Sequence, residues 1–311
     1  VFLVGDPPEE LERGVREVGG EPIRRYPGFI AASIPVSALR SLRGDRIVSV
    51  EPVRRLIPHL DKSLHVIEAD LVHLGMDLPR RYTGEDIVLG FVDTGIDLSH
   101  PAFQYPDGST RVIYLWDQSI SYGIPPEGFS YGHECTGEDI NSAHCSEDDC
   151  GVRIGDMYIS GGHGTHVAGI AGGGALPYQP YVGVAPRALL VFVKTDFFED
   201  HAIDAIEYIL RKARSLSKPV VVNLSAGAGD GPHDGSTPLE RAISALASSG
   251  GTIVVSAGND GGRSIHAGYS LSPGSELRTA IDPTKEGDIL TETWYSGTQT
   301  LCVAVGVETL D

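Results

Sequence analysis

The chain has 311 residues, enough for one large domain or a domain with a smaller companion, and 41% of them are hydrophobic and 21% charged, as in ordinary globular proteins. Its 42 Asp and Glu residues exceed its 24 Lys and Arg residues, which gives a formal net charge of −18. Such a chain repels nucleic acid and anionic membrane surfaces, so neither is expected as a partner. No apolar run approaches the roughly 20 residues that span a bilayer, and no membrane insertion is expected.

Residues 1–60 predict a small α+β module. The predicted elements, in chain order, are a strand at 2–4, a helix that carries Leu11, Val15 and Val18 and ends at Gly19, an extended pair at 23–26 and 29–34, a short helix that begins near Pro35 and ends at Gly44, and a strand at 47–50. The order β-α-β-β-α-β is the split βαβ pattern. By itself, this pattern indicates an ordinary N-terminal subdomain without a function of its own.

From Asp86 the pattern changes to buried strands that alternate with helices. Continuous apolar runs of strand length lie at 87–92, 189–193, 220–222 and 252–255. One helix between them carries an apolar face from Ala202 to Ala213, and another begins at Thr237 with a proline and a capping-box glutamate, Glu240. This alternation predicts an α/β fold with a parallel sheet flanked by helices, and functional residues in the loops at the carboxyl ends of its strands.

Two stretches interrupt the alternation. Residues 104–160 are polar and rich in Gly, Pro, Asp and Glu, which predicts an insertion. Residues 261–311 have the pattern of short strands joined by turns, which predicts the start of a β-rich insertion.

Three polar residues stand at strand ends or helix starts, where a site is expected. Asp93 ends the first buried strand, although it could simply cap the next turn. His163 opens a helix of small residues, and His166 follows it, but no carboxylate accompanies the pair as in a zinc-binding helix. Asn259 follows the fourth strand, where its amide could stabilise an oxyanion or form an Asx turn.

Together, the motifs around these residues resemble those of the subtilisin-like serine proteases, the subtilase family. The matching segments are VDTGID around Asp93, HGTHVAG around His163, VNLS at 222–225 and SAGND around Asn259. The resemblance covers about residues 63–260, which would be the catalytic core, and implies a subtilisin-like fold and an endopeptidase that acts on protein or peptide substrates.

The resemblance also implies a role for each motif residue. Asp93 would orient His163 and stabilise its charge, His163 would act as general base and acid toward a serine, and Asn259 would hydrogen-bond the oxyanion. Small residues from two motifs would line the substrate cleft: Ser225, Ala226, Gly227, Ala257 and Gly258. His166 is expected to be structural.

Under the same resemblance, residues 1–62 are expected to be a propeptide that assists folding and then inhibits the core, with cleavage around 57–62. The family's serine motif does not occur up to Asp311, so the nucleophile is expected beyond this chain, which alone would be inactive. The stretch 261–311 is similar to the insertion that some subtilases carry before the serine, including the clostridial spore-germination group. The alternative function is a pseudoprotease that binds or regulates a protein partner without hydrolysis.

The cysteines leave several alternatives open. Cys135, Cys145 and Cys150 lie close together without a CxxC zinc motif, so a disulfide, unpaired thiols and a metal cluster all remain possible. Such a cluster would draw on neighbouring residues: His133, His144, Asp148 and Asp149. The family's common calcium loop corresponds to 171–177 and carries no ligands, so no metal site is assigned, while acidic runs such as 147–149 could bind calcium elsewhere. An extracellular or cell-surface location is expected.

Overall fold

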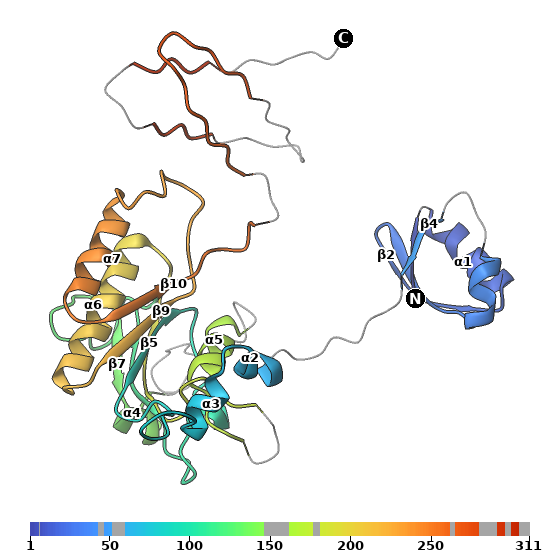
Figure 1. Cartoon of the computed structure of the whole chain (residues 1–311). Helices are drawn as coiled ribbons and strands as arrows, with labels where there is room; N and C mark the ends of the chain where they lie inside the picture. The colour runs from blue at the N-terminus through green and yellow to red at the C-terminus, as the bar shows by residue number, and fades with distance from the viewer. Residues whose placement is uncertain are drawn as a thin grey trace. The chain divides into compact units, whose positions relative to one another are not determined.

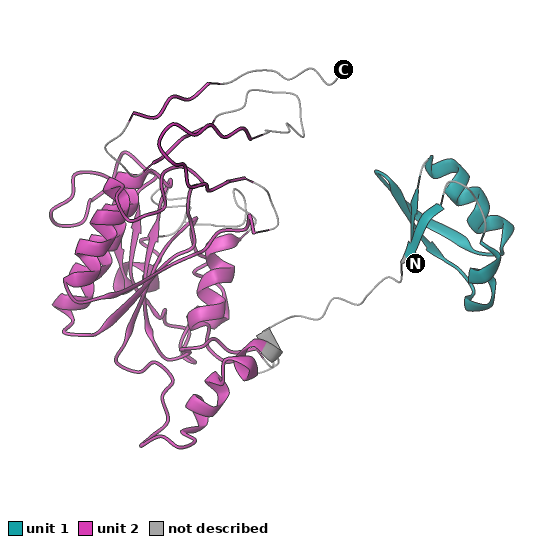
Figure 2. Cartoon of the chain, turned by 45° about the horizontal axis from the view of Figure 1, so that its top comes forward, with its two compact units in different colours: residues 1–59 teal, residues 60–311 magenta. Residues whose placement is uncertain are grey.

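The computed structural model describes residues 1–5, 7–42, 47–51, 60–145, 162–176, 181–261, 265–279, 291–295 and 300–304. The chain forms two compact units, Val1–His59 (unit 1) and Leu60–Asp311 (unit 2), which Figure 2 draws in different colours. The expected cleavage region lies outside the described residues up to position 59, and Leu60 begins the first helix of unit 2. None of the described helices is long and apolar enough to cross a bilayer.

Unit 1 is a small α+β module built on a four-stranded sheet. Its elements are β1 (Phe2–Gly5), α1 (Pro8–Glu17), β2 (Glu21–Tyr26), β3 (Phe29–Ser33), the 3-10 helix η1 (Val36–Ser41) and β4 (Ile47–Glu51). The strands lie in the order β2-β3-β1-β4 with antiparallel neighbours. Leu11 and Val15 are one helical turn apart on α1 and are buried in a common core with Leu3, Ile30 and Ala32 of the sheet.

Unit 2 is built on a six-stranded sheet in the order β10-β9-β5-β8-β6-β7. Its strands are β5 (Val88–Asp93), β6 (Val112–Asp117), β7 (His133–Thr136), β8 (Leu189–Lys194), β9 (Val220–Leu224) and β10 (Thr252–Val255). All neighbours run parallel except β7, which pairs antiparallel with β6 at one edge. The four apolar runs expected as parallel strands are thus confirmed as β5, β8, β9 and β10. The expected burial is wrong for β10: it is the edge strand, and its Val254 and Val255 are 50% and 44% exposed.

Helices lie on both faces of this sheet, and the central strands β5 and β8 are buried along nearly their whole length. The helices of unit 2 are α2 (Leu60–Val66), α3 (Ala69–Leu74), η2 (Pro101–Phe103), α4 (Gly137–Asn141), α5 (His163–Gly172), α6 (Glu199–Ser215) and α7 (Pro238–Ser248). Figure 1 shows α6 and α7 on one side of the sheet and α5 on the other. The capping box predicted at Thr237 is present, because its hydroxyl accepts from the amide of Glu240 and the Glu240 carboxylate accepts from the amide of Thr237.

The alternation of side chains along β5 decides what faces each helix layer. Val88 and Val92 belong to the core under α6, and Gly90 faces the same way, because a Cβ there would lie 2.3 Å from the Ile209 side chain of α6. Phe91 belongs to the other core, under α5. Since side chains in a strand alternate, Asp93 points to the α5 face, like Phe91.

Two stretches differ from the sequence prediction. Residues 104–160, expected as a polar insertion, contribute β6 and β7 to the sheet, and Leu115 and Trp116 of β6 are fully buried. Composition averaged over the whole stretch conceals this short apolar run. In 261–311, the described residues form no helix or strand, so the expected β-rich structure is not seen in them. A strand forms only where a neighbour takes up its backbone hydrogen bonds.

Candidate active site

Asp93 and His163 are joined by a hydrogen bond although 70 positions separate them in the chain. Asp93 ends β5 and is fully buried, and its Oδ1 lies 2.7 Å from Nδ1 of His163 and accepts from the backbone amide of Thr94 at 2.8 Å. A carboxylate can only accept, so Nδ1 carries the proton and the neutral ring keeps its lone pair on Nε2. The side chain of His163 is 47% exposed. This arrangement can serve chemically as a general base whose orientation is held by a buried carboxylate.

Glycine brings the histidine helix close enough to make this contact. Helix α5 starts at His163 after Gly162, which adopts a left-handed conformation with φ of 82°. Gly164 packs against the loop that follows β5, where a Cβ would lie 2.2 Å from the carbonyl oxygen of Gly95 and 3.1 Å from Cβ of Asp93. A residue with a side chain at 164 would push the start of the helix away from Asp93.

Two threonines, which the sequence reasoning passed over, connect the two motifs. The amide of Gly164 donates to the hydroxyl of Thr94 at 3.1 Å, and the amide of Asp97 donates to the hydroxyl of Thr165 at 2.9 Å. Each motif therefore supplies a hydroxyl that satisfies a backbone donor of the other. The sequence signal that could have identified them is their place next to Asp93 and His163 in the two motifs.

A buried ion pair lies beside Asp93 at the same edge of the sheet. In the strand register Asp93 of β5 is opposite Lys194 of β8, and Lys194 is opposite Asp117 of β6. Nζ of Lys194 lies 3.3 Å from the Asp117 carboxylate, and both side chains are at most 7% exposed. These two residues were also missed by sequence analysis, since each ends an apolar run and gives no motif.

The remaining predicted site residues follow the next two strands at the same edge. Val92 is in register with Leu224 of β9, and Leu224 with Val255 of β10, so the loops after β5, β9 and β10 begin side by side. The loop after β9 contains Ser225, Ala226 and Gly227, and the loop after β10 contains Ala257, Gly258 and Asn259. Ser225 and Ala226 are half-buried, and the other four are exposed. Asn259 thus lies two strands away from Asp93 in the sheet order.

Comparison with known proteins identifies the family. A family model described as the subtilase family, peptidase S8, matches residues 84–290, more than half of the chain. The chain belongs to the subtilase family. It is 31% identical over 221 residues to the subtilisin-like protease SBT2.4 of Arabidopsis thaliana, which covers 62% of this chain and 25% of that protein. It is 27% identical over 235 residues to the C5a peptidase of Streptococcus pyogenes, covering 73% of this chain and 19% of that protein.

A solved structure supports the same family and fold. The CspB protease of Clostridium perfringens matches with 32% sequence identity and a TM-score of 0.51, covering 62% of this subtilase chain and 41% of that chain. The chain thus spans well under half the length of each of these relatives. The α/β architecture of unit 2 is the subtilase fold.

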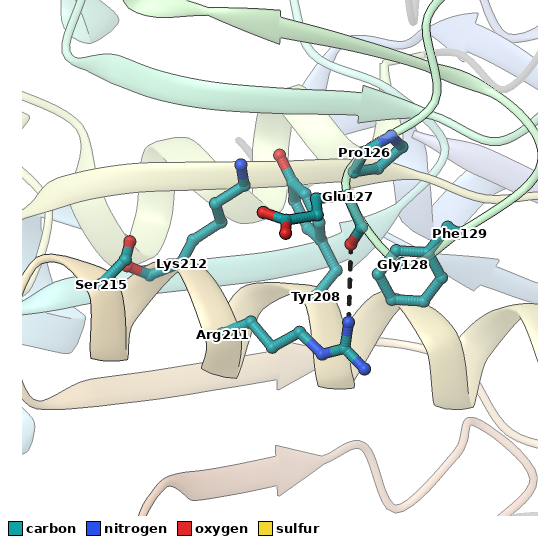
Figure 3. A pocket seen from close by; sticks show the side chains of 8 residues that line it. All are labelled: Pro126, Glu127, Gly128, Phe129, Tyr208, Arg211, Lys212 and Ser215. Atoms are coloured by element: carbon teal, nitrogen blue, oxygen red, sulfur yellow. Dashed lines mark hydrogen bonds between the residues drawn. The ribbon is translucent and has the colours of Figure 1, made fainter.

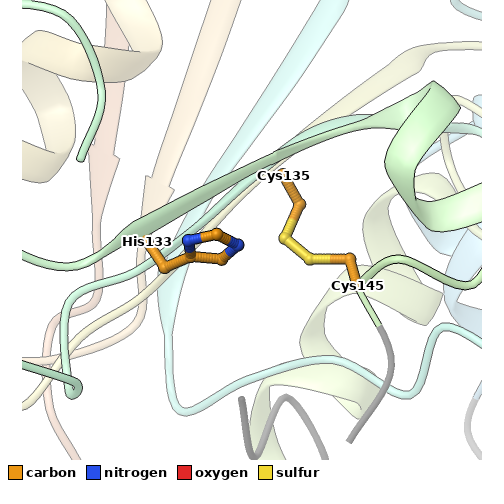
Figure 4. A group of neighbouring side chains, drawn as sticks. All are labelled: His133, Cys135 and Cys145. Atoms are coloured by element: carbon orange, nitrogen blue, oxygen red, sulfur yellow. A yellow bond between two sulfur atoms is a disulfide. The ribbon is translucent and has the colours of Figure 1, made fainter. Parts of the chain in front are cut away.

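The cysteine cluster of this subtilase contains a disulfide rather than a metal site in the described residues. Cys135 of β7 and Cys145 after α4 are joined, and His133 lies close to both sulfur atoms (Figure 4). Nδ1 of His133 accepts from the amide of Ile124 at 2.9 Å, so the neutral ring carries its proton on Nε2 and offers no free lone pair. With both thiols bonded to each other, this group does not fit a metal ion. Cys150, Asp148 and Asp149, and with them the acidic run 147–149, lie outside the described residues.

A surface pocket of about 260 Å³ lies beside α6 (Figure 3). Its walls include Phe129, Tyr208, Arg211 and Lys212. Both cations are already paired, Arg211 with Glu207 and Lys212 with Glu134, each at 2.5 Å. Since α6 leaves the carboxyl edge of the sheet and returns to the amino edge, this pocket at its second half is far from the edge that carries Asp93. We assign it no role.

Proposed function

We propose that the chain is the inhibitory unit and the front part of the catalytic domain of a subtilisin-type serine endopeptidase, whose nucleophilic serine is supplied from outside residues 1–311. The contact between Nδ1 of His163 and Oδ1 of Asp93, 2.7 Å long, carries this proposal. It leaves Nε2 of a half-exposed imidazole as a base at the carboxyl edge of the sheet.

In the proposed reaction, the proton moves through His163 alone. Nε2 takes the proton from the serine hydroxyl while the serine oxygen attacks the peptide carbonyl, and then gives it to the leaving amine. Asp93 stays ionised, holds the proton of Nδ1 and stabilises the positive imidazolium that forms between the two transfers. Its complete burial supports this role, because charge attraction is stronger away from water.

The loops after β9 and β10 would hold the substrate. The backbone at 225–227, which is partly exposed, would pair with the peptide as an added strand, and the side-chain amide of Asn259 would donate to the oxyanion. The small residues Ala226, Ala257 and Gly258 would leave space for a side chain of the substrate. This proposal is supported by the strand register, in which the loops after β9 and β10 begin side by side at the carboxyl edge of the sheet.

Unit 1 would act as an inhibitor of the catalytic unit, and the protein would work outside the cell. A separate core in residues 1–59 supports an independently folding inhibitor. The Cys135–Cys145 disulfide supports an oxidising compartment. Unit 1 supplied in trans should inhibit an active subtilase, and a lack of inhibition would refute this part.

The activity is tested on the longest natural protein that carries this chain. A fluorophosphonate probe should add once to the wild-type protein, and His163→Ala should abolish both the adduct and peptide hydrolysis. Asp93→Asn should lower kcat by about 10⁴-fold, since it favours the wrong imidazole tautomer. His166→Ala, an exposed change on the same helix, is the control and should keep activity. Absence of any adduct in folded wild-type protein would favour the pseudoprotease.

A further inference from the structure

Arg111 is a buried cation that binds backbone carbonyls. It immediately precedes β6 and is only 3% exposed. Its Nη1 donates to the carbonyl oxygens of Ala102 at 3.0 Å and Gly172 at 2.7 Å, and its Nη2 donates to that of Ala188 at 2.9 Å. Among the described residues no carboxylate forms an ion pair with it, so the three carbonyl dipoles compensate its charge.

The three carbonyls come from segments that surround the catalytic dyad. Ala102 lies in η2, in the segment that follows the Asp93 loop, and Ala188 directly precedes β8. Gly172 is the last residue of α5, whose first residue is His163. One guanidinium therefore connects the continuation of the aspartate motif to the far end of the histidine helix.

The contact with Gly172 fits the electrostatics of a helix end. The last carbonyls of a helix have no partners within it and carry the negative end of the helix dipole. Helix α5 has no basic residue in its own last turn, so Arg111 provides a positive charge from outside. The planar guanidinium can reach several carbonyls at once, which an ammonium group does less well.

Helix α5 is thereby held at both ends. Its first turn is bound to the Asp93 loop through Thr94 and Thr165, and its last residue is bound to Arg111. A helix of ten residues is about 15 Å long and moves as one body, so a shift at Gly172 is transmitted to His163. The hydrogen bond of 2.7 Å between His163 and Asp93 tolerates only a few tenths of an ångström before it weakens.

We propose that Arg111 is a positioning residue of the dyad: its carbonyl contacts fix α5 so that the His163–Asp93 hydrogen bond persists. The effect of Arg111 on catalysis rests on the proposed protease function, whereas its effect on the His163–Asp93 hydrogen bond does not. Both consequences are therefore measured separately.

The first test is made on the 311-residue chain by NMR. The Nδ1 proton of His163 should give a downfield resonance, because its hydrogen bond to Asp93 slows its exchange with water. The resonance is assigned by its loss in His163→Ala. In Arg111→Met the resonance should disappear, and in Arg111→Lys its exchange with water should accelerate at least tenfold, because an ammonium replaces the planar donor. Arg187→Met, an exposed change next to Ala188, is the matched control and should leave it unchanged.

Circular dichroism and tryptophan fluorescence establish that each variant is folded. A folded Arg111→Met or Arg111→Lys chain with the wild-type resonance and exchange rate overturns the proposal. If neither variant folds, Arg111 serves folding alone and the proposal is also overturned. A folded variant that is less stable but keeps the His163 resonance and its exchange rate also overturns the proposal.

The second test uses the longest natural protein that carries the chain. Arg111→Lys should lower kcat about tenfold with KM unchanged, because the reacting groups and not the substrate loops are displaced. A tenfold rise in KM with an unchanged kcat would contradict the positioning role of Arg111. If the wild-type protein hydrolyses nothing, the proposed function fails, while the NMR result still decides the role of Arg111.

Discussion

The close approach of α5 to the aspartate loop makes Gly164→Ala the most informative substitution. The added methyl group would lie 2.2 Å from the carbonyl oxygen of Gly95 and 2.9 Å from the ring of Phe192. The helical backbone at position 164 itself suits alanine, so the effect comes from this contact and not from backbone strain. The neighbours are backbone and a fully buried ring, which cannot move aside cheaply.

The size of the effect follows from these distances. Non-bonded carbon atoms prefer separations of about 3.5 Å, so the helix start must retreat by about 1 Å. Such overpacking costs about 1–3 kcal/mol of unfolding free energy. A retreat of that size would also lengthen the His163–Asp93 hydrogen bond from 2.7 Å to beyond hydrogen-bonding distance.

Gly169→Ala on the same helix is the matched control. Nothing lies within 4 Å of a Cβ at Gly169, so alanine there should raise the unfolding free energy by about 0.5–1 kcal/mol through its helix propensity. Urea unfolding followed by tryptophan fluorescence measures both variants in unit 2, since the chain has two tryptophans, Trp116 and Trp294. The downfield resonance of His163 reports the hydrogen bond.

The expected result is a gap of about 2 kcal/mol or more between the two alanine variants, with the resonance lost only in Gly164→Ala. Equal stability of Gly164→Ala and Gly169→Ala would refute the claim that close packing requires Gly164. A destabilised Gly164→Ala with an intact His163 resonance would refute the link between packing and the dyad.

Three further predictions concern local features of unit 2. Thr237→Ala should lower the unfolding free energy by about 1 kcal/mol in urea, because it removes the cap of α7, and an unchanged midpoint would contradict this. The hydrogen bond from the Thr136 side chain lowers the pKa of Asp139 below 3.8, so its stabilisation is complete above that pH and is lost as the pH falls through the lower folded-state pKa. The difference in urea midpoint between wild type and Asp139→Asn should therefore shrink in acid, and a constant difference would oppose this. Cys135 and Cys145 should resist alkylation in unfolded, unreduced protein, because they are joined in a disulfide. This disulfide closes a separation of 10 residues and should raise the free energy of unfolding by about 3 kcal/mol relative to the double serine variant. Alkylation of both thiols would instead mean that the disulfide is absent.

The sequence predicted the elements whose pattern is local and repeated. The runs that form β5, β8 and β9 are almost entirely apolar, because helices cover both faces of the sheet there, and such runs stand out without any structure. The capping box at Thr237 was equally visible, since its partner is three residues away. The motifs around Asp93 and His163 indicated the family, which the comparisons confirm.

Features that depend on distant contacts were missed or left open. Strand β6 was concealed in a polar stretch, since its membership in the sheet depends on pairing with β8, more than 70 positions later. The pairing of Cys135 with Cys145, rather than another arrangement, required their positions on β7 and after α4.

The sequence by itself determined four strands of the sheet, β5, β8, β9 and β10, and the two helices α6 and α7 between them, because apolar runs and apolar periodicity mark these elements locally. Only the tertiary structure decided that Arg111 faces inward and not into solvent. Nothing near it in the chain distinguishes it from an exposed arginine, because its acceptors Ala102, Gly172 and Ala188 offer backbone carbonyls, which every residue has. Their convergence on one guanidinium is a property of the folded chain alone.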